Sequence, residues 1–188
     1  YYFYRKWYPT KHCCMKKAMI LICWYGHPED NWFPWAKKEL EKKGYEVAIP
    51  DLPTIGSDLP DMEQMLKVLT VDKDTVVIGH SLGALLGLRL AERQKFKKLI
   101  LVSGWDYNDL FPQHKLFWPN NLDHEKIKNN VKEFVVIHGS NDPYTTEWGA
   151  KEMAKRLNTQ QMVIVPNGGH LSKKEGNRVD LPEILPYI

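Results

Sequence analysis

A pentapeptide in the middle of the chain has the residue types and spacing of a nucleophilic site. Gly79-His80-Ser81-Leu82-Gly83 follows the apolar run 75–78 and leads into a helical pattern that begins at Leu82. A serine at such a strand–turn–helix junction lies on a sharp turn, and glycines two residues away on either side remove side chains that would collide there. The following helix points its N–H groups toward developing negative charge. We predict that Ser81 is a nucleophile; a structural Gly-Ser turn is the alternative.

A nucleophilic serine needs a base, and the base needs an acid to orient it. Asp142 lies four residues beyond the expected strand 134–138, and His170 lies five residues beyond the expected strand 162–165. Both follow the serine in the order Ser, Asp, His, at the carboxyl ends of strands, where a doubly wound sheet places its site. We predict Asp142 as the acid and His170 as the base. Asp106 after strand 98–102 is the rival acid, and Asp142 before Pro143 also fits a simple turn.

Five other histidines receive different predictions. We expect His80 to support the turn by hydrogen bonding and His138 to be a core or strand-end residue. His114 and His124 are expected to be solvated, and His27 lies near the expected site with no assigned role.

The negative oxygen formed during acyl transfer needs two N–H donors. The first is expected to be the backbone N–H of Leu82, directly after the serine. The second should come from the loop after the first strand, where Trp24 and Tyr25 are the candidates and Gly26 supplies flexibility.

Short apolar runs alternate with longer helical patterns along the chain. Strands are predicted at 18–23, 46–49, 75–78, 98–102, 134–138 and 162–165, and helices at 32–43, 60–70, 82–94 and 146–158. This alternation predicts βαβ units and a doubly wound, mostly parallel sheet of about six strands with helices on both faces. The irregular stretch 103–132, which holds five aromatic residues, is a lid or pocket wall, or else a surface loop packed on the body.

Composition excludes several classes of protein. The chain has 188 residues, of which 43% are hydrophobic and 26% charged, a balance typical of one globular domain. The formal charge of +3 is too small to indicate a nucleic-acid partner. The longest apolar run, residues 18–25, is far shorter than the about 20 residues that a membrane-spanning helix needs, so no membrane is predicted. The three cysteines lack metal-ligand spacing, so neither a metal nor a cofactor is predicted, and a reduced, cytoplasmic compartment fits best.

The two ends of the chain differ from the remainder. Residues 1–14 show no periodicity, and Met15 resembles a natural start, so we expect 1–14 to be an upstream extension or a non-native segment, with an aromatic N-terminal arm as the alternative. Residues 1–14 hold three basic residues and no acid, so the expected single domain 15–188 has no net charge. Residues 185–188 read as the first turn of a helix, which predicts truncation at that helix.

The chain from Met15 onward resembles the small serine hydrolases related to retinoblastoma-binding protein nine and the YdeN-like proteins, a largely lidless branch of the α/β-hydrolase fold. The resemblance rests on motifs in the right order: Asn31-Trp32-Phe33-Pro34-Trp35, Ile49-Pro50-Asp51-Leu52-Pro53, the Ser81 pentapeptide, Leu101-Val102-Ser103-Gly104, Asp142-Pro143, Gly168-Gly169-His170, Glu175-Gly176 and Leu181-Pro182. It implies Ser81, Asp142 and His170 as nucleophile, acid and base.

This sequence departs from that family's pattern at the end of the first strand. Relatives carry a His-Gly pair there, whereas this chain reads Ile22-Cys23-Trp24-Tyr25-Gly26. The bulky Trp or Tyr is expected either to narrow the oxyanion pocket or to alter its backbone. The Leu-x-Cys-x-Glu pattern of retinoblastoma-pocket ligands is also absent, so that partner does not carry over.

These observations predict a metal-free serine hydrolase, carboxylesterase-like, that cleaves small carboxylic esters, and also small amides, through an acyl-enzyme. A thioester or an aminoacyl amide is a further substrate class that the sequence leaves open. The alternative from another class is a catalytically weak or inactive binding protein on the same fold. A monomer is the default oligomeric state.

Overall fold

Six parallel strands build one sheet in the computed structural model, which describes residues 15–188. The predictions on residues 1–14 lie outside the described residues. The sheet order is β2-β1-β3-β4-β5-β6. The strands are β1 (Lys16–Leu21), β2 (Tyr45–Ala48), β3 (Val76–His80), β4 (Phe96–Val102), β5 (Val131–Gly139) and β6 (Met162–Val165). The predicted doubly wound parallel sheet of about six strands is therefore confirmed, with shifts of a few residues at the strand ends.

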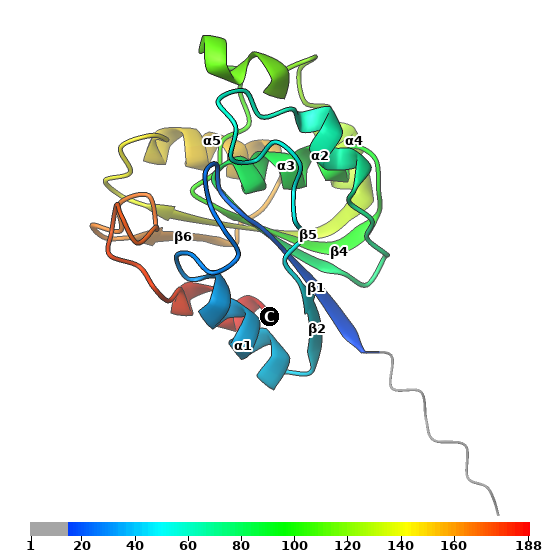
Figure 1. Ribbon diagram of the computed structural model, residues 1–188, viewed down its shortest axis with the longest axis vertical. Coiled ribbons are helices and arrows are strands. Elements are labelled where there is room, and N and C mark those ends of the chain that lie inside the picture. The colour runs from blue at the N-terminus through cyan, green and yellow to red at the C-terminus, as the bar shows by residue number, and fades with distance from the viewer. Residues whose placement is uncertain (1–14) are drawn as a thin grey trace, which may run out of the picture.

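Helices cover both faces of this sheet (Figure 1). One face carries α1 (Phe33–Lys42) and the C-terminal 3-10 helix η2 (Pro182–Tyr187). The other face carries α3 (Leu82–Ala91), α4 (His124–Asn130) and α5 (Glu147–Arg156), and α2 (Met62–Lys67) packs beside α3. All ten residues of α3 are buried, as expected for a central helix that is apolar on every side except at Arg89. The nucleophile turn thus begins a helix that the core holds in place.

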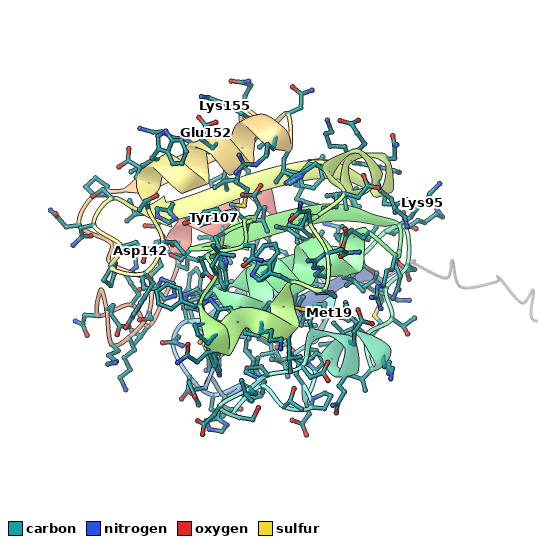
Figure 2. The ribbon with its side chains drawn as sticks, turned by 90° about the horizontal axis from the view of Figure 1, so that it is seen from above. Met19, Lys95, Tyr107, Asp142, Glu152 and Lys155 are labelled. Carbon is teal, nitrogen blue, oxygen red and sulfur yellow. The ribbon has the colours of Figure 1, made fainter. Side chains whose placement is uncertain are left out.

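The parallel topology brings the loops that follow the strands to one edge of the sheet, where their carboxyl ends lie. The strand order reverses between β1 and β3, which are adjacent and in register from Ala18 opposite Val76 to Leu21 opposite Gly79. Ligands of open α/β sheets bind in the crevice outside the carboxyl ends of the strands at such a reversal. The loop after β1 and the turn after β3 meet at this point. Figure 2 shows Asp142, which follows β5, at one end of the molecule and Lys95, which precedes β4, at the other.

Three predictions about elements need correction. The stretch 103–132 is not wholly irregular, because it contains the 3-10 helix η1 (Pro112–Phe117) and α4. The C-terminal turn is a 3-10 helix, and Pro186 lies inside it. Trp148 recurs with Met153, Ala154 and Leu157 at helical spacing, which predicts one shared apolar face, but Trp148 is 70% exposed whereas Met153 is fully buried.

Candidate functional site

Ser81 lies on a strained turn between β3 and α3. Its φ is 56° and its ψ is −118°, in the left-handed half of conformational space that a non-glycine residue rarely adopts. Its backbone N–H donates to the Val102 carbonyl oxygen at 2.9 Å, which ties the turn to β4. Strain of this kind persists only where the surrounding structure enforces it, and it concentrates at functional sites.

The two glycines of the pentapeptide are sterically required, but for a reason more specific than the sequence suggested. A Cβ on Gly79 would lie 2.3 Å from the Gly83 carbonyl oxygen, and a Cβ on Gly83 would lie 2.1 Å from the Leu21 carbonyl oxygen. Helix α3 therefore begins directly against the ends of β1 and β3. Because both contacts are with backbone atoms, neither can relax by rotation of a side chain.

Ser81, His170 and Asp142 form a continuous hydrogen-bonded chain. The Ser81 hydroxyl lies 2.8 Å from His170 Nε2, and His170 Nδ1 lies 2.8 Å from Asp142 Oδ2 and 3.0 Å from Asp142 Oδ1. Since a carboxylate only accepts, His170 Nδ1 donates to it, which leaves Nε2 free to accept the serine proton. The structure thus brings together the three residues that the sequence singled out.

The Asp142 carboxylate is fully shielded from solvent and remains the charged partner of this chain. Burial alone would raise its pKa, but the hydrogen bond and charge of His170, together with the Tyr144 and Thr145 N–H groups, outweigh burial and lower the pKa of Asp142. Those two backbone N–H groups donate to Oδ1 at 2.9 and 3.1 Å, and the Thr145 hydroxyl donates to Oδ2 at 3.1 Å.

The loop that carries His170 depends on close backbone contacts. Gly169 has a φ of +57°, and a Cβ there would lie 2.2 Å from the Glu175 carbonyl oxygen. A Cβ on Gly139 at the end of β5 would lie 2.0 Å from the Gly169 carbonyl oxygen. The Asn141 side-chain oxygen accepts a hydrogen bond from the Gly169 N–H at 2.8 Å, a role that no sequence pattern indicates. These contacts fix the loop against the Asp142 turn.

Asp106, the rival acid, has other partners. Arg156 binds it through two hydrogen bonds of 2.6 and 2.7 Å, and His124 Nε2 lies 2.7 Å from it. Burial would raise the pKa of Asp106, but the hydrogen bonds from His124 and Arg156 outweigh burial and lower it. Asp106 therefore clamps α4 and α5 to the end of β4.

The other histidines divide into two that are fully buried and three that reach solvent. His80 and His138 are fully buried, and their Nε2 atoms lie 2.9 Å from the His170 carbonyl oxygen and 3.2 Å from the Thr145 carbonyl oxygen. The prediction that His114 and His124 are solvated is wrong. The ring of each lies 2.7 Å from an aspartate, and each side chain is only about one fifth exposed. The backbone N–H of His27 donates to Asp30 at 2.8 Å.

The two candidates for the second oxyanion donor differ in whether their backbone N–H already donates a hydrogen bond. The Tyr25 N–H donates to the Ile55 carbonyl oxygen at 3.3 Å, whereas the Trp24 N–H has no hydrogen-bond partner within residues 15–188. Leu82 is the first residue of α3, so its N–H has no partner within the helix. The arrangement therefore favours Leu82 and Trp24 over Tyr25.

A cleft of about 970 Å³ opens beside Ser81 and His170. One wall is aromatic and comes from the loop after β1 and the segment after β4: Trp24, Tyr25, Trp105, Tyr107, Phe111 and His114. Trp24 stacks on Tyr25 at 5.3 Å and meets Phe117 edge-on at 5.6 Å. The effect of these bulky residues on the oxyanion pocket stays a prediction. The stretch 103–132 thus supplies a pocket wall. Asn31, Tyr144 and Lys173 also line the cleft.

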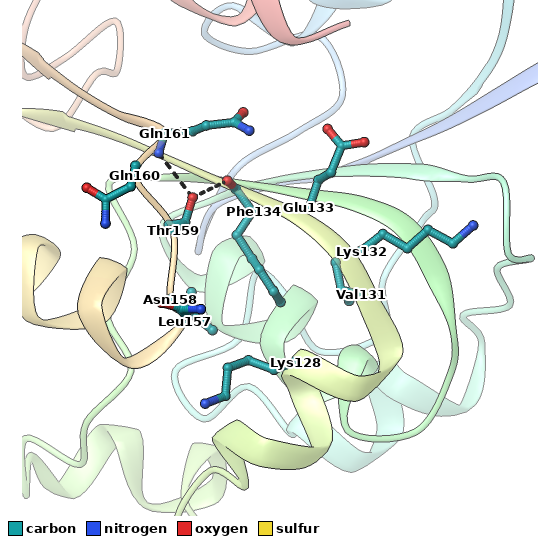
Figure 3. A pocket seen from close by; sticks show the side chains of 10 residues that line it. All are labelled: Lys128, Val131, Lys132, Glu133, Phe134, Leu157, Asn158, Thr159, Gln160 and Gln161. Carbon is teal, nitrogen blue, oxygen red and sulfur yellow. Dashed lines mark hydrogen bonds between the residues drawn. The ribbon is translucent and has the colours of Figure 1, made fainter.

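A second, smaller cavity of about 340 Å³ lies at the other end of β5 (Figure 3). It is lined by residues around Thr159, whose hydroxyl donates to the Phe134 carbonyl oxygen and accepts the Gln161 N–H. It holds none of the predicted site residues. Within residues 15–188 no group of three His, Cys, Asp or Glu side chains is arranged to hold a metal ion, and no helix is long and apolar enough to cross a membrane.

Comparisons with known proteins match almost the whole of the described chain. Residues 18–187 match the model of the family described as serine hydrolase. YdeN of Bacillus subtilis (strain 168) is 30% identical over 175 residues, which cover 86% of this chain and 90% of YdeN. Serine hydrolase RBBP9 of Rattus norvegicus is 28% identical over 156 residues, 77% of this chain and 80% of that protein.

Solved structures show the same relationship. The crystal structure of the ydeN gene product from B. subtilis superposes with a TM-score of 0.80 at 27% identity, covering 92% of this chain and 96% of that chain. Est1E from Butyrivibrio proteoclasticus has a TM-score of 0.67 at 16% identity, covering 92% of this chain and 84% of that chain. The second likeness shows the fold alone.

Proposed function

Because this chain belongs to the serine hydrolase family, with the α/β-hydrolase fold, we propose that it cleaves small carboxylic esters through Ser81, His170 and Asp142. The observation that carries the proposal is the 2.8 Å contact between the Ser81 hydroxyl and His170 Nε2, with His170 Nδ1 donating to Asp142 at 2.8 Å. A nucleophile hydrogen-bonded to a base that a third group orients is the arrangement that acyl transfer requires.

The first half of the proposed reaction acylates Ser81. His170 Nε2 takes the hydroxyl proton while Ser81 Oγ attacks the ester carbonyl carbon and forms a tetrahedral intermediate. Asp142 keeps the proton on Nδ1 and stabilises the imidazolium. His170 then gives the proton on Nε2 to the leaving alkoxide, the carbon–oxygen bond breaks, and the alcohol departs.

The second half releases the acid. His170 removes a proton from a water molecule that attacks the acyl carbonyl, and it returns this proton to Ser81 Oγ as the ester bond to the enzyme breaks. In both halves the Leu82 and Trp24 N–H groups hold the negative oxygen in our proposal. Loss of one such donor typically costs about 10²- to 10³-fold in kcat.

The substrate class follows from the cleft. Its aromatic wall, with Trp24, Trp105 and Phe111, favours an apolar acyl or aryl group beside Ser81. The proposed reaction requires no metal ion, since the nucleophile and the base are side chains of the protein itself. Small amides are the second substrate class, because the same acyl-enzyme forms from them with an amine as leaving group.

Steady-state kinetics on a panel of p-nitrophenyl esters, aminoacyl-arylamides and acyl thioesters tests the proposal. We expect the p-nitrophenyl esters to be the best substrates and Ser81→Ala to lower kcat by about 10⁴-fold or more. Ser57→Ala is the matched control, since the exposed Ser57 hydroxyl bonds only the Thr54 carbonyl oxygen. A Ser81→Ala variant with more than about 1% of wild-type turnover would overturn the proposal. Absence of turnover on the whole panel would favour a binding protein on the same fold.

A further inference from the structure

His80 is the residue directly before Ser81, and its side chain is fully buried at the end of β3. Its Nε2 lies 2.9 Å from the backbone carbonyl oxygen of His170. A carbonyl oxygen only accepts, so Nε2 carries the proton and donates it. The residue beside the nucleophile is therefore hydrogen-bonded to the backbone of the residue that serves as the base.

The surroundings of His80 favour this single neutral form. Its Nδ1 has no hydrogen-bond partner within residues 15–188. The rings of Trp32 and Phe33 pack against the imidazole, with centroids 5.6 and 5.8 Å away. Burial, together with the charge of the nearby His170, lowers the pKa of His80 to about 3, against smaller opposing effects of its hydrogen bond to the His170 carbonyl and of the Asp142 and Glu175 charges. His80 therefore stays uncharged and leaves the proton transfer to His170.

The loop that carries His170 needs such an anchor. Its neighbours Gly169 and Leu171 both have positive φ, 57° and 49°, so the local backbone is held away from its ordinary conformations. The Trp32 indole N–H donates to the Leu171 carbonyl oxygen at 2.9 Å. His80 supplies the hydrogen bond from the last residue of β3, and a single peptide bond separates His80 from the nucleophile Ser81.

We propose that His80 is a positioning residue, which sets the distance between His170 Nε2 and Ser81 Oγ by holding the His170 carbonyl oxygen. The proposal rests on the proposed function of Ser81 and His170. His80 takes no part in proton transfer and does not touch the substrate carbonyl. Its contribution is geometric, and displacement of a base by about 1 Å can cost about 10²-fold in rate.

Two substitutions separate this role from a packing role. His80→Leu fills the space but removes the donor, and His80→Gln keeps an N–H at the place of Nε2. We expect His80→Leu to lower kcat by about 10- to 100-fold with KM changed by less than about threefold, and His80→Gln to restore kcat to within about threefold of wild type. Rates are expressed per active site titrated with a fluorophosphonate, so that loss of folded protein does not count.

Ile127→Val, a buried change in α4 remote from the cleft, controls for destabilisation alone. A kcat per site for His80→Leu within about twofold of wild type would overturn the proposal, and so would a glutamine variant as impaired as the leucine variant. If the wild-type protein took up no fluorophosphonate, the proposed function itself would fail instead. The two failures are therefore distinguishable.

The wild-type protein provides a second measurement that does not depend on folding of the leucine variant. In histidine-selective ¹⁵N NMR, with the His80 signals assigned by difference from His80→Gln, the ring should remain in the Nε2–H form between about pH 5 and 8. An Nδ1–H form, or titration of His80 within that range, would overturn the proposal.

Discussion

Replacement of Asp142 by asparagine should trap His170 in the wrong tautomer. Asp142 Oδ1 accepts two backbone N–H groups, from Tyr144 at 2.9 Å and Thr145 at 3.1 Å. An asparagine side chain must therefore place its carbonyl oxygen at the position of Oδ1 and its NH₂ at the position of Oδ2. That NH₂ faces His170 Nδ1 at about the present 2.8 Å separation, nearer than the 3.0 Å of the oxygen at the Oδ1 position, and can only donate to it. The proton then moves to Nε2, which can no longer accept from Ser81.

The size of the effect follows from this inversion. The variant keeps the shape of the site and both backbone hydrogen bonds, so binding of the ester should change little. The loss falls on the chemical step, because the base must first give up the tautomer that the asparagine stabilises. We expect kcat to fall by about 10⁴-fold, which corresponds to about 5 kcal/mol of activation free energy.

The assay is hydrolysis of a p-nitrophenyl ester at neutral pH, with kcat and KM compared between variants at equal amounts of folded protein. Asp106→Asn is the matched control, since it removes a charge from an equally buried aspartate that binds Arg156 and His124 instead. We expect it to lose stability but to keep kcat within about threefold of wild type. An Asp142→Asn variant within about tenfold of wild type, or a larger kcat loss in Asp106→Asn, would refute the reasoning.

Three further predictions concern the framework of the site. Gly83→Ala should destabilise the protein by about 3 kcal/mol in urea unfolding, because its Cβ would lie 2.1 Å from the Leu21 carbonyl oxygen; an unchanged midpoint would contradict this steric account. Asp106 has its pKa lowered from 3.8, so the unfolded chain takes up that proton first as the pH falls, and native stability should drop below about pH 4. The melting temperature of Asp106→Asn should fall less steeply with decreasing pH than that of wild type. An equally steep fall would contradict the role of Asp106 in holding α4 and α5. Burial raises the pKa of the Cys23 thiol from 9.0 to about 11. Iodoacetamide at pH 8 should therefore alkylate Cys23 about a hundredfold more slowly in the folded protein than in urea. Equal alkylation rates, measured by peptide mass spectrometry, would contradict this effect of burial.

The sequence predicts the nucleophile turn well because its requirements are local. The glycines flanking Ser81 are needed by the turn itself, and the helix that follows is apolar on every side except at Arg89, so pattern and packing agree. The parallel sheet is predictable for a similar reason, since strands buried on both faces read as continuous apolar runs.

The choice between Asp142 and Asp106 lies beyond sequence spacing. Both acids follow a strand of the same parallel sheet, and only tertiary contacts separate them. Arg156, fifty residues further along the chain, donates a hydrogen bond to Asp106. His170 instead contacts Asp142, and Asn141 holds the loop that carries His170. Contacts of that range leave no local signal.

The wall of the cleft and the oxyanion loop show the same limit. Arg89 appears in an apolar helical pattern, yet its guanidinium is buried and donates to the Phe117 and Asn120 carbonyl oxygens, which attaches the aromatic segment to α3. Whether Trp24 or Tyr25 offers a free N–H depends on the Ile55 carbonyl oxygen, which comes from a different loop. Periodicity describes which face of an element is apolar, not which backbone groups meet across loops.

The central claim is that Ser81 is the nucleophile of a serine hydrolase. Treatment of the folded protein with a fluorophosphonate, followed by intact mass and fragment spectra, tests it most directly. We predict a single phosphonyl adduct on Ser81, and no adduct in Ser81→Ala or in wild-type protein unfolded beforehand. A folded protein that remains unlabelled, or an adduct that persists in Ser81→Ala, would contradict the account.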